Sequence, residues 1–462
     1  MKDNIMNKTK FSSAENIFLI ICLFVGLVFI SITPIWQIPD EEAHFLKMYS
    51  ITDGHFNFEK CKLDDGKTYS CTNVPLSILS IRENSEKISL LFFDRQKIKP
   101  LEKNKKDYLI YMVPSYSLFS YMPTILVLQV LKTLNIPPVY IIYILRFIFL
   151  FTYCTIVYFA IKITPVKKHL FTLCGLVPTA IYSASGISAD GLIISLCFLY
   201  IAYIFNLAFN KHIKNLSKLN IFSLFLLLLY ITVCKFPYGF LAFLICIIPQ
   251  QKFKFYSKPK TIITILTFII MYVIWHILHH IYMTKGISSS VPWFVSPIET
   301  LQYSIQNPLF FIDSLIKSIK INSLDWYGGT VARYGWENIY IPISIIAPYG
   351  ITLALSGFFQ DKDEIESDIS TFKNKMIYLF IGILFFITTY TICYLLFSNA
   401  SHQTVIKFQG RYFIPILPLI YLLLSTRIPV KYNGLKIISL LSYLFLIFIS
   451  IIILISKFYI NT

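Results

Sequence analysis

Charged residues are scarce in this sequence. Asp, Glu, Lys and Arg make up only 14% of the 462 residues, whereas 56% are hydrophobic and 17% are aromatic. Soluble globular domains carry about 25% charged residues. The sequence also lacks an internal repeat, a low-complexity tract and a fingerprint for a nucleotide or redox cofactor. These absences exclude a soluble enzyme and indicate an integral membrane protein.

Long apolar runs, by contrast, recur along the whole chain. They are continuous, and do not alternate with the period of two that is typical of transmembrane barrels. We predict an all-α integral membrane protein with about 11–13 transmembrane helices, because most of the runs are long enough to cross ~30 Å of hydrocarbon as a helix. The chain, residues 1–462, is expected to form a single membrane domain. The candidate spans are residues 16–36, 112–131, 139–161, 169–188, 190–209, 219–234, 237–249, 261–283, 340–358, 376–398, 411–426 and 436–457.

Acidic residues are fewer than basic ones, 24 against 41, which gives a formal net charge of +17. The basic residues gather in short loops near residues 2–10, 162–168, 211–218, 252–260, 362–375 and 427–436. Short loops rich in Lys and Arg face the cytoplasm. The charge therefore indicates orientation and not a nucleic-acid partner. We expect a protein of the bacterial cytoplasmic (inner) membrane with its N-terminus inside.

This orientation places two long polar segments outside the cytoplasm. Residues 37–108 form the first extracytoplasmic loop and residues 284–339 the second extracytoplasmic segment. The first alternates acids, bases and apolar pairs, which favours short amphipathic helices on the outer membrane face. A solvated linker is the alternative.

One candidate span conflicts with this orientation. If residues 112–131 cross the membrane fully, the basic loop at 162–168 lies outside despite its three lysines. The conflict disappears if 109–131, interrupted by Pro114 and Pro123, is interfacial or re-entrant. The sequence leaves this open.

Cysteine is nearly confined to the apolar segments, where a thiol behaves as a small hydrophobe. Cys61 and Cys71 are the exceptions, since both lie in the first extracytoplasmic loop. A disulfide between them is possible in an oxidising compartment. Their spacing alone does not decide it.

Acids gather directly after the first span, in the sequence PDEEAH at residues 39–44. Asp40 as a helix N-cap with Glu41 in the first turn would be explained by capping alone. The same helix places His44 four residues after Asp40 and three after Glu41, so the imidazole shares a face with both acids. Such a group beside apolar surface is suited to general-base catalysis. The residues support both interpretations.

Further charged residues interrupt or border the apolar segments. Arg411 and Lys235 lie at predicted outer helix ends, where they could bind a phosphate or extend to the interface. Arg146 lies within a span, which indicates a functional site or a pair with an acid such as Asp190. Asp190 could be an N-cap, or could join Asp40 in holding a divalent cation. No ligand spacing is visible, so we assign no metal residues.

Residues 325–337 combine Trp and Tyr side chains with acids and Arg333. This mixture suits the binding of sugar rings. It is equally typical of an aromatic belt at the membrane interface.

Four motifs resemble those of a bacterial family of predicted multi-pass membrane proteins of unknown function. They are IPDEEAHF at 38–45, SADGL at 188–192, KFPY at 235–238 and FQGRYFIP at 408–415. The resemblance covers essentially the whole chain, and the first and last motifs are the most specific.

At greater distance the pattern is similar to the GT-C glycosyltransferases, which include the protein O-mannosyltransferases. Those enzymes place a catalytic acid just after the first helix and use polyprenyl-phosphate sugars as donors. The resemblance implies a GT-C-like fold, with Asp40 as the catalytic base and Glu41 assisting. The His-Pro-Pro of the mannosyltransferases has no counterpart, because residues 111–116 read YMVPSY.

The expected function is transfer of a sugar from a polyprenyl-phosphate-linked donor to an envelope glycan, lipid or protein acceptor. The alternatives are a transporter or flippase for a lipid-linked glycan, a polysaccharide polymerase or ligase, and a structural assembly factor without catalysis. A transporter should carry inverted repeats and polar residues near mid-membrane, whereas the polar residues here concentrate at one boundary. Membrane lipid is a further expected partner. The expected donor-binding residues are His44, Arg146, Asp190, Lys235, Gln409, Arg411 and Tyr412.

Overall fold

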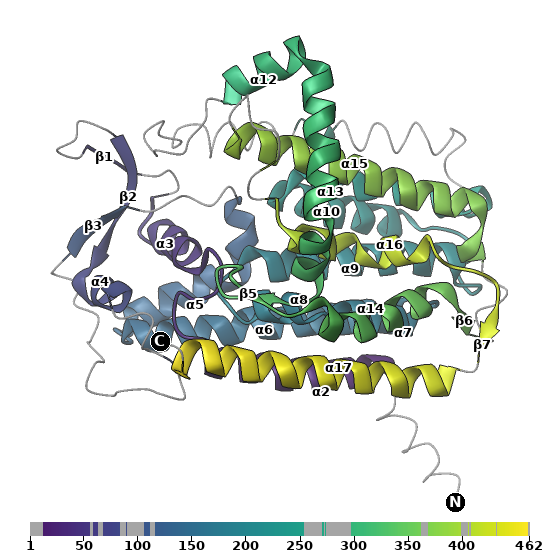
Figure 1. Cartoon of the computed structure of the whole chain (residues 1–462), viewed down its shortest axis with the longest axis horizontal. Coiled ribbons are helices and arrows are strands. Elements are labelled where there is room, and N and C mark those ends of the chain that lie inside the picture. Colours follow the sequence, from purple (N-terminus) through teal and green to yellow (C-terminus); the bar gives the residue numbers. More distant parts are fainter. Residues whose placement is uncertain are drawn as a thin grey trace, which may run out of the picture.

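The protein is largely helical, and its long helices lie side by side in one bundle (Figure 1). The computed structural model describes residues 13–55, 59–62, 68–83, 89, 106–110, 116–253, 270–271, 273, 297–361, 368–398, 405, 408–430 and 432–460. The predicted span 261–283 therefore lies almost wholly outside the described residues.

Five of the described helices are long and apolar enough to cross a membrane. Their sequences are apolar almost all round, as expected for helices that face lipid on one side and protein on the other. α9 is the most buried of the five and forms the centre of the bundle. The five are α2 (Ala14–Ile32), α6 (Pro138–Ile163), α9 (Ala189–Phe209), α15 (Phe372–Phe397) and α17 (Tyr432–Ile455).

The other predicted spans are shorter or broken, so the described part has fewer full-length spans than the 11–13 expected. Proline is the main reason, because it removes a backbone donor and clashes with the preceding turn. Pro178 starts a new helix within 169–188, and 237–249 is a 3-10 helix that begins next to Pro237. The elements are α7 (Lys168–Gly175), α8 (Pro178–Ala184), α10 (Lys218–Cys234), η4 (Phe236–Ile247), α14 (Ile343–Phe358), η8 (Gly410–Ile416) and α16 (Leu417–Leu422).

The described part of the predicted span at 112–131 contains no helix long enough to cross a membrane. It contains η3 (Leu118–Tyr121) and α5 (Met122–Thr133), and α5 has only 12 residues. Arg146 near the start of α6 donates to the carbonyl oxygens of Thr33 and Pro34, which directly follow α2. The end of α2 therefore lies beside the first turns of α6. This arrangement favours the interfacial or re-entrant interpretation of 109–131, and the cytoplasmic position of the basic loop at 162–168 stays a prediction.

The predicted loop 37–108 contains helices, but also strands that were not expected. β1 (Glu59–Lys62), β2 (Thr68–Pro75) and β3 (Lys106–Ile110) form an antiparallel sheet beside α4 (Leu76–Glu83). α3 (Glu41–Thr52) is not a surface amphipathic helix, because most of its side chains are buried in protein. Cys71 on β2 is in a disulfide. The side chain of Cys61 lies outside the described part.

The described part of 284–339 consists of α12 (Pro297–Gln306), α13 (Pro308–Val331) and the hairpin strands β4 (Arg333–Tyr334) and β5 (Ile339–Tyr340). α13 runs steeply across the long helices (Figure 1). Its last turn packs against η8, which brings residues near 330 and 410 together.

Lysines cap helix C-termini at the end of the bundle opposite to α3. Nζ of Lys252 donates to the carbonyls of Leu207, Ala208 and Asn210 at the end of α9. Lys167 donates to carbonyls at the end of α14, and the β6 (Gln360–Asp361) and β7 (Pro429–Val430) strands pair there. Cations satisfy the last carbonyls of a helix and complement its dipole. The basic loops thus have a structural role as well.

Candidate functional site

Charged side chains from five distant segments meet at the end of the bundle near α3. We call Asp40, Asp190, Lys235, Glu337 and Arg411 the charged cluster. Arg411 is its centre: Nη2 donates to Oδ2 of Asp40 at 3.1 Å, and Nε lies 3.3 Å from Oδ2 of Asp190 and 3.8 Å from Oε1 of Glu337. Three carboxylates therefore surround one guanidinium.

Asp40 has an unusual backbone conformation. It precedes the first turn of α3 with φ 60° and ψ 8°, and its side chain makes no capping hydrogen bond. Left-handed backbone in a residue other than glycine is uncommon, and such strain tends to persist at functional sites. The capping interpretation is therefore wrong for the Asp40 side chain, which turns to Arg411 and remains 49% exposed.

Asp190 is held from two sides. Ser188 caps α9 by accepting a hydrogen bond from the Asp190 backbone N–H, which fixes the first turn. The Tyr116 hydroxyl donates to Oδ1 of Asp190 at 2.6 Å and accepts from Nζ of Lys235 at 2.9 Å. Nζ of Lys235 also lies 3.6 Å from Oδ1 of Asp190. Tyr116 thus links the acid to the second cation of the cluster.

Glycine sets the position of Arg411. A Cβ added at Gly410 would overlap the backbone of Trp326 and lie close to Thr330. The Thr330 hydroxyl donates to the Gly410 carbonyl at 2.8 Å. The sequence QGRY therefore needs glycine so that η8 can approach α13 closely, and this contact directs Arg411 into the cluster.

Two further expected donor-binding residues, Gln409 and Tyr412, lie beside Arg411 in the sequence. The Tyr412 ring lies beneath Lys235, whose Nζ is 4.4 Å from the ring centroid, a cation–π arrangement. Oε1 of Gln409 is buried and has no hydrogen-bond partner among the described residues. A buried amide oxygen without a partner is costly, so Gln409 offers an acceptor to a bound ligand.

His44 and Lys47 on α3 lie beneath the cluster. Nδ1 of His44 is hydrogen-bonded to the Tyr121 hydroxyl at 2.6 Å, and Lys47 donates to the Tyr116 carbonyl. Burial lowers the pKa of His44 to about 4, although Asp40 opposes this shift, and burial lowers the pKa of Lys47 to about 7. The imidazole is therefore neutral at physiological pH.

Acidification should destabilise the fold through His44. The imidazole pKa is about 4 in the folded protein against 6.5 for a free side chain, so the unfolded state binds more protons between these values. The free energy of unfolding then falls as the pH drops through that window. We expect the thermal transition of the purified protein to fall between pH 6.5 and 4. His44→Gln should reduce this dependence, and an unchanged slope in the variant would contradict the assignment.

Glu41 and Arg146 form a separate, fully buried pair behind the cluster. Nε and Nη2 of Arg146 donate to the two carboxylate oxygens of Glu41, both at 2.7 Å, and both side chains are 0% exposed. The backbone N–H groups of Trp36 and Ile187 also donate to Glu41. Arg146 therefore pairs with Glu41 and not with Asp190. Both carboxylate oxygens of Glu41 are already occupied.

Sequence reasoning assigned no site role to Tyr116 or Lys47, and it considered Glu337 only as part of the 325–337 stretch that could bind sugar rings. Lys47 had a detectable signal, because it follows His44 by three residues and so shares its helix face. Glu337 lies in the 325–337 stretch on a turn with φ 62° between β4 and β5. Nearby, Arg333 forms a two-point ion pair with Asp325 at 2.5 and 2.8 Å. Tyr116 carried no signal, since an isolated tyrosine is ordinary in this composition.

Within the described ranges, no group of three or more His, Cys, Asp and Glu side chains is arranged to hold a metal ion. The carboxylates of the charged cluster are instead directed at Arg411 and Lys235. A divalent cation stays a prediction without a ligand set.

The fold and the cluster define a class: a multi-pass helical membrane protein with a charged site where several helices begin or end. Residues 23–420 match the family described as "Predicted membrane protein (DUF2142)", and the chain belongs to this family. This confirms the expected membrane family. No curated protein and no solved structure matches the chain.

Proposed function

We propose that this protein is a GT-C-type glycosyltransferase of the bacterial cytoplasmic membrane. It transfers a sugar from a polyprenyl-phosphate-linked donor to an envelope acceptor on the outer face. The observation that supports this most directly is the ion pair of a half-exposed carboxylate, Asp40, with Arg411, which Asp190 links to a second cation, Lys235. A carboxylate supplies a base, and the cations bind a phosphate.

The balance of charge in the cluster gives Asp40 its role. Three carboxylates face two cations, so an incoming phosphate competes with the carboxylates for Arg411. The Asp40 side chain is 49% exposed, against 11% for Asp190 and 27% for Glu337. Asp40 is therefore the partner that a phosphate displaces most readily. Donor binding then frees the base next to the sugar that will react.

The transfer step follows from these positions. Asp40 accepts the proton of the acceptor hydroxyl while the acceptor oxygen forms a bond to the anomeric carbon, as the base of an inverting glycosidase does with water. The bond between that carbon and the phosphate oxygen breaks, and its electron pair leaves with the polyprenyl phosphate. Arg411 and Lys235 neutralise the charge that develops on this phosphate. Gln409 and Tyr412 bind the donor beside them.

We place the cluster on the outer face of the membrane and the N-terminus inside. The opposite end of the bundle carries the lysine-rich loops, including Lys167, Lys168 and Lys252 at helix ends. Short basic loops remain in the cytoplasm. In this orientation the cluster faces the side on which envelope glycans are assembled.

A reconstituted transfer assay tests the proposal. The full chain in liposomes receives polyprenyl-phosphate hexoses with a radiolabelled sugar, together with an envelope extract as acceptor. We expect label to move from the lipid fraction to the acceptor. Lys235→Met should reduce the rate on the order of 10²-fold, the usual loss when one charge-stabilising donor is removed.

The matched control is Lys317→Met on α13. Lys317 is 40% exposed and forms an ion pair with Asp313, four residues earlier on the same helix. The transfer rate of this variant should therefore stay near that of the wild type. If label stays on the donor for every hexose tested, the transferase proposal fails. Label that crosses the bilayer without leaving its lipid would identify a transporter instead.

A further inference from the structure

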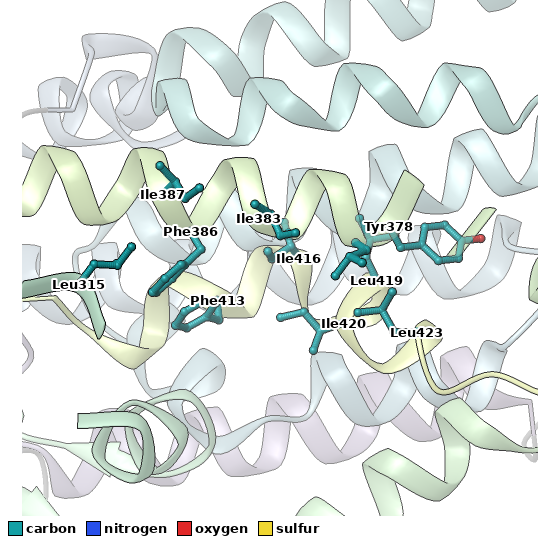
Figure 2. Close-up of a pocket in the computed structure, with 12 residues that line it drawn as sticks. Leu315, Tyr378, Ile383, Phe386, Ile387, Phe413, Ile416, Leu419, Ile420 and Leu423 are labelled. Carbon is teal, nitrogen blue, oxygen red and sulfur yellow. The ribbon is translucent and has the colours of Figure 1, made fainter. Parts of the chain in front are cut away.

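An apolar groove of about 360 Å³ lies between α15 and the η8–α16 segment. One wall is formed by α15 residues from Tyr378 to Ile387, and the other by Phe413 to Leu423. Leu315 of α13 lies at one end of the row, and Tyr378 and Leu423 lie at the other (Figure 2). Along α15 the groove extends for roughly 14 Å at 1.5 Å per residue.

The groove and the charged cluster share one element. η8 directs Arg411 and Tyr412 towards Asp40 and Lys235, whereas the next residue, Phe413, lines the groove and stacks on Phe386 at 6.1 Å. The Phe413 end of the groove is the end nearer to the cluster. A cationic site and an apolar groove whose residues are two positions apart on the same element are complementary to a ligand with an anionic head and a hydrocarbon tail.

Gly382 leaves the wall of the groove open. It lies in the middle of α15, and a Cβ added there would meet nothing within 4 Å. Glycine within a helix costs about 1 kcal/mol relative to alanine, and here no close backbone contact requires it. What the missing side chain provides is space in the groove.

We propose that this groove holds the hydrocarbon tail of a polyprenyl phosphate whose phosphate binds Arg411 and Lys235. The inference rests on the proposed function and adds a tail site formed by α15, η8 and α16. Bulk phospholipid also contacts the lipid-facing surface of any membrane protein. The tail site differs because its occupant is fixed at one end by the cationic cluster.

Gly382→Leu adds an apolar side chain to the groove wall at a position where its Cβ meets nothing within 4 Å, and gives a direct test. The full chain, purified in nanodiscs, is titrated with undecaprenyl phosphate or with dimethylallyl phosphate, which has a single isoprene unit. Binding is read from the ligand-induced rise of the thermal transition. We expect Gly382→Leu to weaken undecaprenyl phosphate binding at least tenfold and to leave dimethylallyl phosphate binding unchanged. Arg411→Gln should weaken both.

Gly434→Leu on α17 is the matched control, because Gly434 also faces open space on an apolar helix. It should bind both phosphates as the wild type does. Equal wild-type affinity for the long and the short phosphate would overturn the tail site and leave the phosphate site standing. Undiminished binding in Gly382→Leu would also overturn it. Phosphatidylglycerol that binds as tightly as undecaprenyl phosphate, and that Gly382→Leu weakens equally, would overturn the tail site too. If the wild type binds neither phosphate, the proposed function falls as well.

Discussion

Asp40→Asn should reduce sugar transfer on the order of 10²–10⁴-fold, the range contributed by a positioned general base. The amide keeps the shape of the side chain but cannot accept the acceptor's proton. The fold should not change, because Asp40 makes no capping bond and is half exposed. The measurement is the reconstituted transfer rate, together with the envelope glycan profile of a complemented deletion strain at matched protein level.

Glu42→Gln is the matched control for this variant. It neutralises an acid in the same first turn of α3, and we expect activity close to that of the wild type. Full activity in Asp40→Asn would remove Asp40 from the mechanism. Equal losses in both variants would instead indicate an effect on the helix and not on a base.

Glu41→Gln should reduce the amount of folded protein, whereas Asp40→Asn should reduce activity and leave the fold unchanged. It leaves the Arg146 guanidinium buried beside a neutral amide, and breaking a buried ion pair costs about 3–5 kcal/mol. Arg146→Met should be comparably damaging, because it strands the Glu41 carboxylate. We expect lower abundance in the membrane and a lower thermal transition in detergent for both single variants.

The double variant Glu41→Leu/Arg146→Met separates charge from packing. Replacing a buried pair by apolar side chains of similar volume is often neutral or stabilising, but here four backbone groups also lose their partners. The double variant should therefore recover only the part of the loss that comes from an unpaired buried charge. If Glu41→Gln were as stable as the wild type yet inactive, the expected catalytic role of Glu41 would replace the structural one.

Local sequence signals predicted the local structure of this protein well. The helices α2, α6, α9, α15 and α17 follow from uninterrupted apolar runs, since a helix satisfies its backbone within its own segment. The breaks at Pro178 and Pro237 were also visible in the sequence, but 169–188 and 237–249 were still expected as single spans. The three-stranded sheet was missed because strand pairing depends on partners elsewhere in the chain.

Sequence motifs also identified most members of the charged cluster. Asp40, Asp190, Lys235 and Arg411 were visible because a charge beside an apolar run is costly unless it has a partner or a use. Tyr116 was not assigned, since it does not interrupt an apolar run, and Glu337 was considered only within the 325–337 stretch. Their roles depend on contacts with Asp190 and Arg411.

The sequence by itself determined the membrane class, the long helices and which charges needed an explanation, because each depends on the composition of a continuous segment. Only the tertiary structure decided which acidic side chain pairs with which basic side chain. Asp40 and Arg411 are 371 residues apart, and Glu41 and Arg146 are 105 apart. Adjacent acids thereby acquire different surroundings: Glu41 points inward to a buried arginine, and Asp40, in a left-handed turn, points to the exposed cluster. No property of the two residues in isolation distinguishes them, because burial and the choice of partner arise only when distant helices pack together.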